Sequence, residues 1–358
     1  MNNKRYHLLT LLLAAAFMSS GCANVDYKFE TITWGYGSGD GRGMEAKFAY
    51  PRGIAVDQQG NLFVADSRNK RIRKITPDEK VTTFAGRDRK PGESRFRDGL
   101  RQEAVFIAPE SLALDEDGNL YVSDSNAIRK IVMDEENGDR VITFAGVSDK
   151  GGYRDGKGSE ARFRSVRGLA MDLDGNLLVA DAGNAVVRRV TSDGEVSTVA
   201  GIPRDIRVSL KGPPADGPAN EVKFGLIQDL CMAADGTIYL THTGPGAVRK
   251  IDPEGNVTTL ADGESIGLPK GICLDHKGNL LVVNDLQRSI VRITPEGDQE
   301  TVAGYLYDDA FVIFRRGRDS GFIRRARFAS PHGITIDDNG VLYITDVGEH
   351  AIRVGRPR

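Results

Sequence analysis

Six polar residues occupy one position in a series of similar segments, each directly before a short apolar stretch. They are Arg52, Glu110, Arg167, Gln228, Lys270 and His332. Arginine and lysine bind carboxylate, sulfate or phosphate groups through charge-assisted hydrogen bonds, so a ring of these residues could hold a small anionic ligand. The simpler interpretation is a water-filled pore with polar walls. We predict that the six side chains surround an axial opening, and we take them as the candidate ligand site.

The histidine of this set, His332, is a possible metal ligand. The last segment contains Pro331-His332-Gly333, then Asp337, Thr345-Asp346-Val347 and His350. These residues resemble one blade of the peptidyl-hydroxyglycine amidating lyases, six-bladed enzymes that hold zinc with three histidines near the axis. The corresponding positions of the other segments hold no histidine, and a catalytic zinc needs about three protein ligands. We therefore expect no metal, no cofactor and no catalytic residue.

An enzyme is nevertheless the alternative to a binding protein. A divergent metal-dependent lyase or lactone hydrolase would place its site at the same axial channel. Lactone hydrolases of the gluconolactonase type would need acidic and Asn ligands there, and Glu110 is a single candidate. No recognisable motif for nucleophilic catalysis is present either.

Residues 305–325 combine aromatic and cationic side chains. The ones that we take as a candidate partner or ligand loop are Tyr305, Tyr307, Phe311, Phe314, Arg315 and Arg316. Aromatic residues and arginine are enriched where proteins bind partners. The alternative is that the loop folds its aromatic side chains under itself as a small satellite core.

An aspartate and an arginine recur in the segments at matching places. The aspartates are Asp66, Asp124, Asp181, Asp285 and Asp346, and the arginines are Arg73, Arg129, Arg188, Arg249, Arg292 and Arg353. A catalytic role would not need so many copies, so we interpret each pair as a structural contact between neighbouring strands. The fourth segment is irregular: His242 replaces the aspartate, which leaves Arg249 without its expected partner, and Asp229 and Ala233 also depart from the pattern.

The elements that carry these residues are repeats. Residues 48–86 read FAYPRGIAVDQQGNLFVADSRNKRIRKITPDEKVTTFAG, related copies begin at Phe106 and Phe163, and weaker ones at Phe224, Leu268 and Phe328. Each copy predicts four short strands separated by turns that contain glycine or proline. Such sheets cannot bury both faces alone and stack radially. The copies resemble NHL repeats, which implies an all-β, six-bladed β-propeller of four-stranded antiparallel blades.

The predicted ring closes through the two parts of the chain that are farthest apart. The sixth copy ends after its third strand, Ala351 to Val354, while Thr31-Ile32-Thr33-Trp34-Gly35 resembles the missing fourth strand. We therefore expect an N-terminal strand to complete the last blade and to remove an open sheet edge.

Residues 1–21 read as a signal peptide of the lipoprotein type. Lys4 and Arg5 precede an apolar run from Leu8 to Met18, which is too short to span a bilayer as a helix. The run leads to Cys22, and the junction resembles the bacterial lipoprotein cleavage box, in which the cysteine is lipidated. An ordinary secretory signal is the alternative. Residues 22–358 would then form the exported propeller, attached to the membrane only through the lipid.

Two cysteines, Cys231 and Cys273, occupy matching positions in successive repeats. We interpret them as small buried side chains, with a disulfide as the alternative in an oxidising compartment.

The net charge and isoelectric point argue against nucleic acid as a partner. The formal net charge is −2 and the isoelectric point is near 6.3, so no global basic field would recruit nucleic acid. We expect a monomeric, membrane-anchored lipoprotein of the bacterial cell envelope. It would act as a non-catalytic binding or scaffold module for an envelope protein, a carbohydrate or a small anionic ligand.

Overall fold

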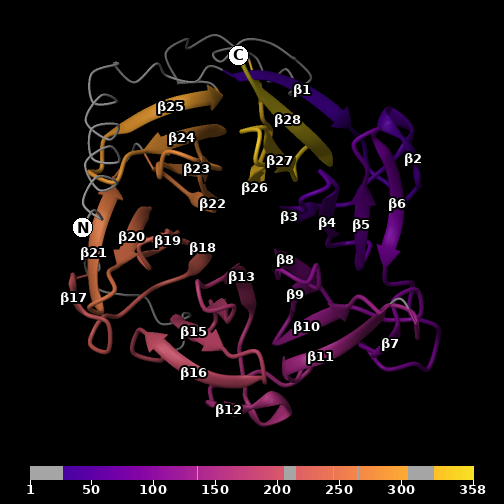
Figure 1. Ribbon diagram of the computed structural model, residues 1–358, viewed down its shortest axis with the longest axis horizontal. Coiled ribbons are helices and arrows are strands. Elements are labelled where there is room, and N and C mark those ends of the chain that lie inside the picture. The colour runs from indigo at the N-terminus through magenta and orange to yellow at the C-terminus, as the bar shows by residue number, and fades with distance from the viewer. Residues whose placement is uncertain (1–26, 135, 205–214, 245, 264–265, 305–325) are drawn as a thin grey trace, which may run out of the picture.

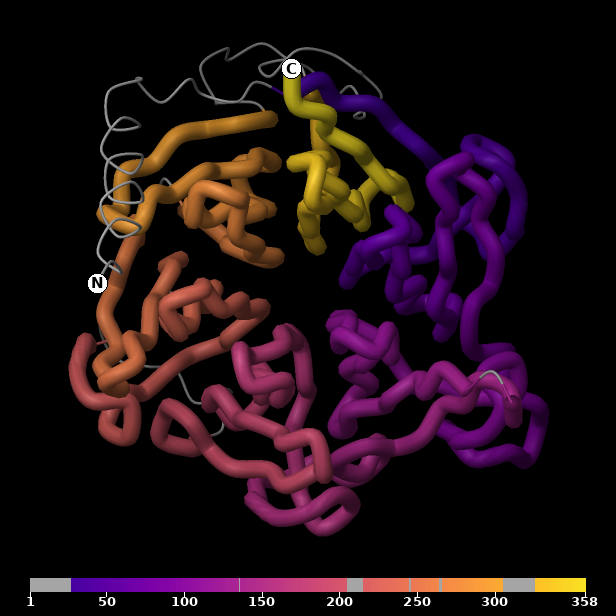
Figure 2. Tube along the Cα trace, in the orientation of Figure 1, coloured from indigo at the N-terminus to yellow at the C-terminus, as the bar shows by residue number. Residues whose placement is uncertain are grey.

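The computed structural model describes residues 27–134, 136–204, 215–244, 246–263, 266–304 and 326–358. Six antiparallel sheets stand around a central axis, which confirms the predicted all-β, six-bladed propeller (Figure 1). The chain passes once around the ring from blade to blade, and its C-terminus lies beside the first described strand (Figure 2). The predicted signal peptide, Cys22 and the aromatic loop of residues 305–325 lie outside the described residues.

Each blade has an inner strand at the axis and a second strand paired with it. From blade one to blade six the inner strands are β3 (Pro51–Val56), β8 (Pro109–Leu114), β13 (Val166–Met171), β18 (Ile227–Met232), β22 (Pro269–Leu274) and β26 (Pro331–Ile336). The second strands are β4 (Leu62–Asp66), β9 (Leu120–Asp124), β14 (Leu177–Asp181), β19 (Ile238–His242), β23 (Leu280–Asn284) and β27 (Leu342–Asp346).

The outer half of each blade is formed by a third and a fourth strand. The third strands are β5 (Arg71–Ile75), β10 (Ala127–Val132), β15 (Val186–Val190), β20 (Ala247–Ile251), β24 (Ser289–Ile293) and β28 (Ala351–Pro357). The fourth strands are β6 (Lys80–Ala85), β11 (Arg140–Gly146), β16 (Glu195–Ala200), β21 (Asn256–Asp262), β25 (Gln299–Gly304) and, for blade six, β1 (Tyr27–Thr33).

Blades one to four carry a fifth, two-residue strand at their outer edge, where we predicted four strands. These strands are β2 (Gly41–Arg42), β7 (Gly99–Leu100), β12 (Gly156–Lys157) and β17 (Gly217–Pro218). Each follows directly on an aspartate of the connection between blades. Two short 3₁₀ turns, η1 (Gly43–Glu45) and η2 (Gly158–Glu160), follow β2 and β12. Within the described residues, no helix is long and apolar enough to cross a membrane.

The hydrophobic core is divided among the contacts between blades. Six clusters of buried side chains are present in the described residues, and each combines residues of two neighbouring blades. Between blades one and two, for example, Phe63 and Phe84 of the first blade pack with Phe106, in the connection before β8, and with Val122 of β9. Alternation along the strands supplies an apolar face on each side of a blade, so stability depends on an unbroken ring.

The N-terminal strand closes the ring as predicted. β1 pairs antiparallel with β28, from Tyr27 opposite Pro357 to Thr33 opposite Ile352. The side chains of Tyr27 and Phe29 enter the cluster between blades five and six, whereas Ile32 enters the cluster between blades six and one. One strand therefore supports both interfaces of the last blade.

Candidate functional site

The six predicted ring residues do converge at one end of the axial channel. Each is the second residue of an inner strand, and the inner strands are the innermost elements of all six blades (Figure 1). Glu110, Arg167, Gln228, Lys270 and His332 line one pocket, and Arg52 reaches it through an ion pair from Nη1 to Glu110 Oε1 at 2.7 Å. The repeat register thus predicted the juxtaposition of these side chains.

The charges of this ring are unevenly paired. Arg52 is balanced by Glu110, but Arg167 donates to the neutral side-chain oxygen of Gln228. Among the described residues, no salt bridge is present for Arg167 or Lys270. Two cationic side chains of the ring therefore lack a salt bridge, although Glu110 acts on Arg167 and Asp285 acts on Lys270 over longer distances.

Burial perturbs the titration of these groups in a consistent direction. Desolvation lowers the pKa of Arg167 against the opposing charge of Glu110. Desolvation also lowers the pKa of Lys270, where Asp285 opposes the shift and the cations Arg167 and Arg52 add to it. The pKa of His332 lies well below its usual value, first because of burial and then because of the nearby cations Arg52 and Lys270. His332 is therefore neutral at physiological pH, and the ring is short of negative charge.

Buried hydroxyl groups fix the backbone that carries the ring. Thr345 Oγ1 accepts a hydrogen bond from Gly333 N at 2.8 Å and donates to the carbonyl of Arg52 at 2.5 Å. Thr241 Oγ1 likewise donates to the carbonyl of Lys270 at 2.6 Å. These hydrogen bonds connect neighbouring inner strands, so the backbone that carries the ring side chains is held in place.

Asp229 also lines the candidate site, although the sequence indicated only that this residue departs from the repeat pattern. It follows Gln228 on β18 and lines the same pocket. Burial raises its pKa from 3.8 to about 7, against the opposing effect of backbone N–H groups of Leu230 and Ile272. A carboxyl group that titrates near neutrality in a channel is typical of a functional site. The sequence signal was a lone Asp where other repeats carry Gly or Ser.

A larger axial cavity of about 310 Å³ continues from the ring pocket. The two spaces share Gly53, Ser111, Asp229 and Gly333, so Asp229 lies at their junction. The pocket beside the ring has a volume of only about 20 Å³, which suits one polar group rather than a whole molecule. Any larger ligand would need to extend into the cavity.

Both cysteines line that cavity as free thiols. Burial raises the pKa of Cys231 and Cys273, which keeps both protonated at neutral pH. Within the described residues, no group of three His, Cys, Asp or Glu side chains is arranged to hold a metal ion.

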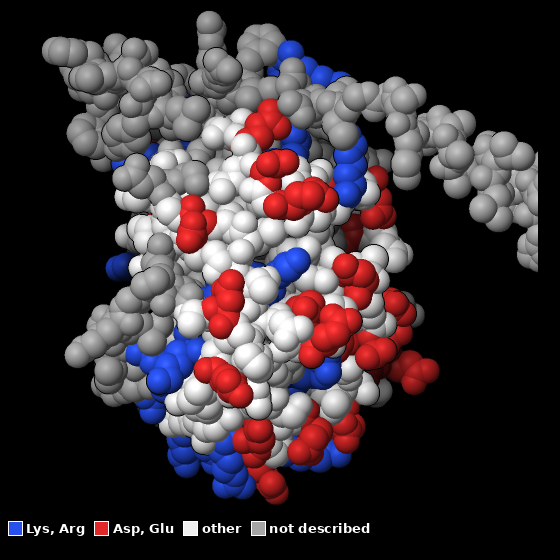
Figure 3. Space-filling model, turned by 90° about the vertical axis from the view of Figure 1, so that its left-hand side faces the viewer, with Lys and Arg blue, Asp and Glu red and all other residues white. Residues whose placement is uncertain are grey.

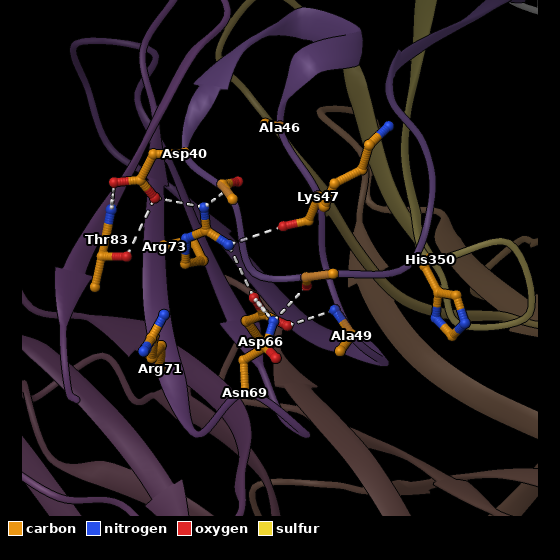
Figure 4. A network of polar contacts seen from close by, with 12 residues as sticks. Asp40, Ala46, Lys47, Ala49, Asp66, Asn69, Arg71, Arg73, Thr83 and His350 are labelled. Atoms are coloured by element: carbon orange, nitrogen blue, oxygen red, sulfur yellow. Dashed lines mark hydrogen bonds and ion pairs between the residues drawn. The ribbon is translucent and has the colours of Figure 1, made fainter. Parts of the chain in front are cut away.

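The repeated Asp and Arg residues form buried clamps away from the axis. In blade one the guanidinium of Arg73 contacts Asp66 at 3.0 Å and Asp40 at 2.6 Å, while Asp40 also accepts from the backbone and hydroxyl of Thr83 (Figure 4). Arg73 also lies over the ring of Phe48, 4.9 Å from its centroid. The same set recurs around Arg129 and Arg188.

The clamp assignment in blade five was wrong. The second strand ends at Asn284, and Val282 pairs with Val291, the position that holds arginine in the other blades. Asp285 and Arg292 are each one residue beyond the clamp positions. Because side chains alternate along a strand, this shift places Arg292 on the opposite face, where it contacts Glu300 at 3.0 Å. Blade five thus has Asn and Val in place of the ion pair.

Blade four retains half a clamp. Arg249 lacks a second-strand aspartate, as the sequence indicated, but it retains the carboxylate of the preceding connection, Asp216, at 3.0 Å. Burial and the neighbouring Arg249 lower the pKa of His242 to about 4, and its Nε2 accepts a hydrogen bond from Gly225 N at 2.6 Å. His242 is thus a neutral structural acceptor in the position of the aspartate.

One side of the ring has mixed charge (Figure 3). Acidic and basic side chains are interspersed over the side of the ring that Figure 3 shows, without a continuous basic area on that face.

Comparison with known proteins agrees with the repeat assignment. The family model "NHL repeat" matches residues 48–75 and 328–354, in blades one and six. Among curated proteins, human NHL repeat-containing protein 2 is 24% identical over 85% of this chain and 46% of its own length. Mouse teneurin-3 is 24% identical over 82% of this chain and 10% of its own length. The chain therefore spans less than half of either relative.

Solved structures share the fold at low identity. A Bacteroides thetaiotaomicron protein of unknown function is 21% identical over 93% of this chain and 76% of its own, with a TM-score of 0.66. A protein described as an auxiliary nutrient binding protein from the same species is 12% identical over 93% of this chain and 77% of its own (TM-score 0.65). A Xanthomonas campestris gluconolactonase is 15% identical over 93% of this chain and 90% of its own (TM-score 0.59).

Proposed function

We propose that this six-bladed NHL-repeat propeller is a binding module that holds a small anionic ligand at its axis. The observation that carries the proposal is the pair of cations, Arg167 and Lys270, which line the axial pocket without a salt bridge among the described residues. An anion there would offset the repulsion and desolvation that lower the pKa values of both groups. Similarity in fold to proteins described as nutrient-binding agrees with a binding role.

Removing one of the two cations should weaken anion binding about tenfold or more. In calorimetric titrations of the full-length chain with acetate, succinate, sulfate and phosphate, we expect at least one anion to bind. Lys270→Met should weaken it by at least the tenfold that corresponds to ~1.4 kcal/mol. Lys80→Met, which removes an exposed lysine of β6, is the matched control and should bind normally. Equal binding by the two variants would disprove the axial site.

We further propose that the module is exported and anchored in the cell envelope by a lipid on Cys22, with the propeller free to meet carbohydrate or an envelope protein. The support is the charged and apolar order of residues 1–21. In bacteria grown with labelled palmitate, the native chain should carry the label and Cys22→Ser should not. A Cys22→Ser variant that keeps the label would exclude lipidation at this residue.

A further inference from the structure

Asp229 places a carboxylate where the other inner strands have almost no side chain. The equivalent residues are Gly53, Ser111, Gly168, Gly271 and Gly333. A Cβ atom at Gly168 would lie 2.5 Å from both the Cα and Oδ1 atoms of Asp229, a distance that no packed structure tolerates. Gly168 therefore leaves the space that Oδ1 of Asp229 occupies, whereas the equivalent glycines Gly53 and Gly333 admit backbone atoms of the next blade.

The Asp229 carboxylate has little internal compensation. Its Oδ2 accepts a long hydrogen bond of 3.3 Å from Ile272 N, and the backbone N–H of Leu230 also contributes. In the described residues, no lysine, arginine or histidine lies within ion-pair distance of it. A carboxylate that is desolvated without a cation is unfavourable unless a partner arrives. Asp229 also lies at the junction of the ring pocket and the axial cavity, where a ligand group could reach it.

The axial site therefore presents cations and, separate from them, a carboxyl group that a bound ammonium group would hold in its ionised form. The cations Arg167 and Lys270 belong to the ring, whereas Asp229 is one residue farther along its strand, toward the cavity. We propose that the site recognises a small zwitterion, with an acid group at Arg167 and Lys270 and an ammonium group at Asp229. The proposal rests on the proposed function, since the acid group is the anion already assigned to the ring.

The volumes agree with a ligand of this shape. About 20 Å³ beside the ring accommodates the acid group, and the cavity of about 310 Å³ accommodates the remainder. Amino acids with their charges at the two ends of a short chain match this arrangement. A simple carboxylic acid of equal length would satisfy the ring alone and leave Asp229 unpaired.

A series of matched probes tests the inference. The full-length chain would be titrated with ω-amino acids of two to six carbons and with the carboxylic acids of equal length. We expect at least one amino acid to bind about tenfold more tightly than its matched acid. In Asp229→Asn, which retains an acceptor for Ile272 N, that gain should vanish while affinity for the simple acid stays within twofold.

The possible failures are distinguishable. If neither series binds, the proposed function itself is wrong. If acids bind but the amino group adds nothing, or if Asp229→Asn keeps the gain, the axial site stands and the zwitterion proposal is overturned. Thermal unfolding of Asp229→Asn reports whether the variant is folded. A second variant, Asp229→Ser, copies the residue of blade two and should lose the same gain.

Discussion

Removal of β1 is expected to destabilise the whole propeller by roughly 5–8 kcal/mol. Three side chains of this strand are buried in two separate interfaces: Tyr27 and Phe29 between blades five and six, and Ile32 between blades six and one. Full burial of one such side chain contributes about 1.5–3 kcal/mol. The backbone hydrogen bonds to β28 are lost as well. The edge of β28 then becomes exposed and can pair with strands of other chains.

The experiment compares two truncated chains. One begins at residue 26 and keeps β1, and the other begins at residue 34 and lacks it. We expect the longer chain to melt like the full-length protein and remain monomeric in gel filtration. The shorter chain should melt at a much lower temperature and elute partly as aggregates. Equal melting temperatures for the two would show that β1 does not hold the ring closed.

The closing strand could be predicted because a segment near the N-terminus resembles the fourth strand of the repeats. The segment from Thr31 to Gly35 resembles the fourth strands of the repeats, and the last repeat lacks one. The observed strand lies slightly earlier, from Tyr27 to Thr33. The axial ring was predictable for a related reason: a side chain that directly precedes a repeated strand reaches the same place in every blade. Periodicity therefore determines position in a propeller, even where residue identity varies.

Other features depend on tertiary context that periodicity does not contain. In blade five, either Asn284 or Asp285 could be aligned with the last residue of the second strand in the other blades. The alignment on Asp285 was chosen because the other repeats have aspartate there, and it was wrong by one residue. One residue of shift exchanges the faces of a strand. The significance of Asp229 was hidden for another reason, because its perturbed pKa comes from burial by neighbouring blades. The contact of Arg249 with Asp216 was not predicted because Asp216 lies in the preceding connection.

The natural exception in blade five suggests how a clamp can be replaced. There Asn284 Nδ2 donates to Gln287 Oε1 at 3.1 Å, and Val291 packs in the cluster between blades four and five. Blade three carries Asp181, Asn184 and Arg188 at the corresponding positions. We therefore expect that the complete set of blade five can replace the set of blade three.

Breaking the clamp of blade three by a single substitution is expected to reduce stability by about 3–5 kcal/mol. Arg188→Val leaves Asp181 buried and without its cation, since both side chains are fully inaccessible and lie 3.0 Å apart. Removing one partner of a buried ion pair has an effect of this size. Lys157→Met, which breaks an exposed pair with Asp193, is the control and should change stability by less than ~1 kcal/mol.

Copying all three residues of blade five should recover much of this loss. In the triple variant D181N/N184Q/R188V the buried charge is absent, and the introduced amide side chains can form the hydrogen bond seen between Asn284 and Gln287. We expect chemical denaturation to place the triple variant at least ~1.5 kcal/mol above Arg188→Val, because an unpaired buried carboxylate is less favourable than a neutral amide pair. A triple variant as unstable as the single one would mean that the carbonyl groups of Arg154 and Arg162, which also accept hydrogen bonds from Arg188, dominate the clamp. The two results distinguish two roles of Arg188: compensation of the Asp181 charge and hydrogen bonding to the backbone. The same outcome is expected in blade one, where Arg73 also donates to two backbone carbonyls.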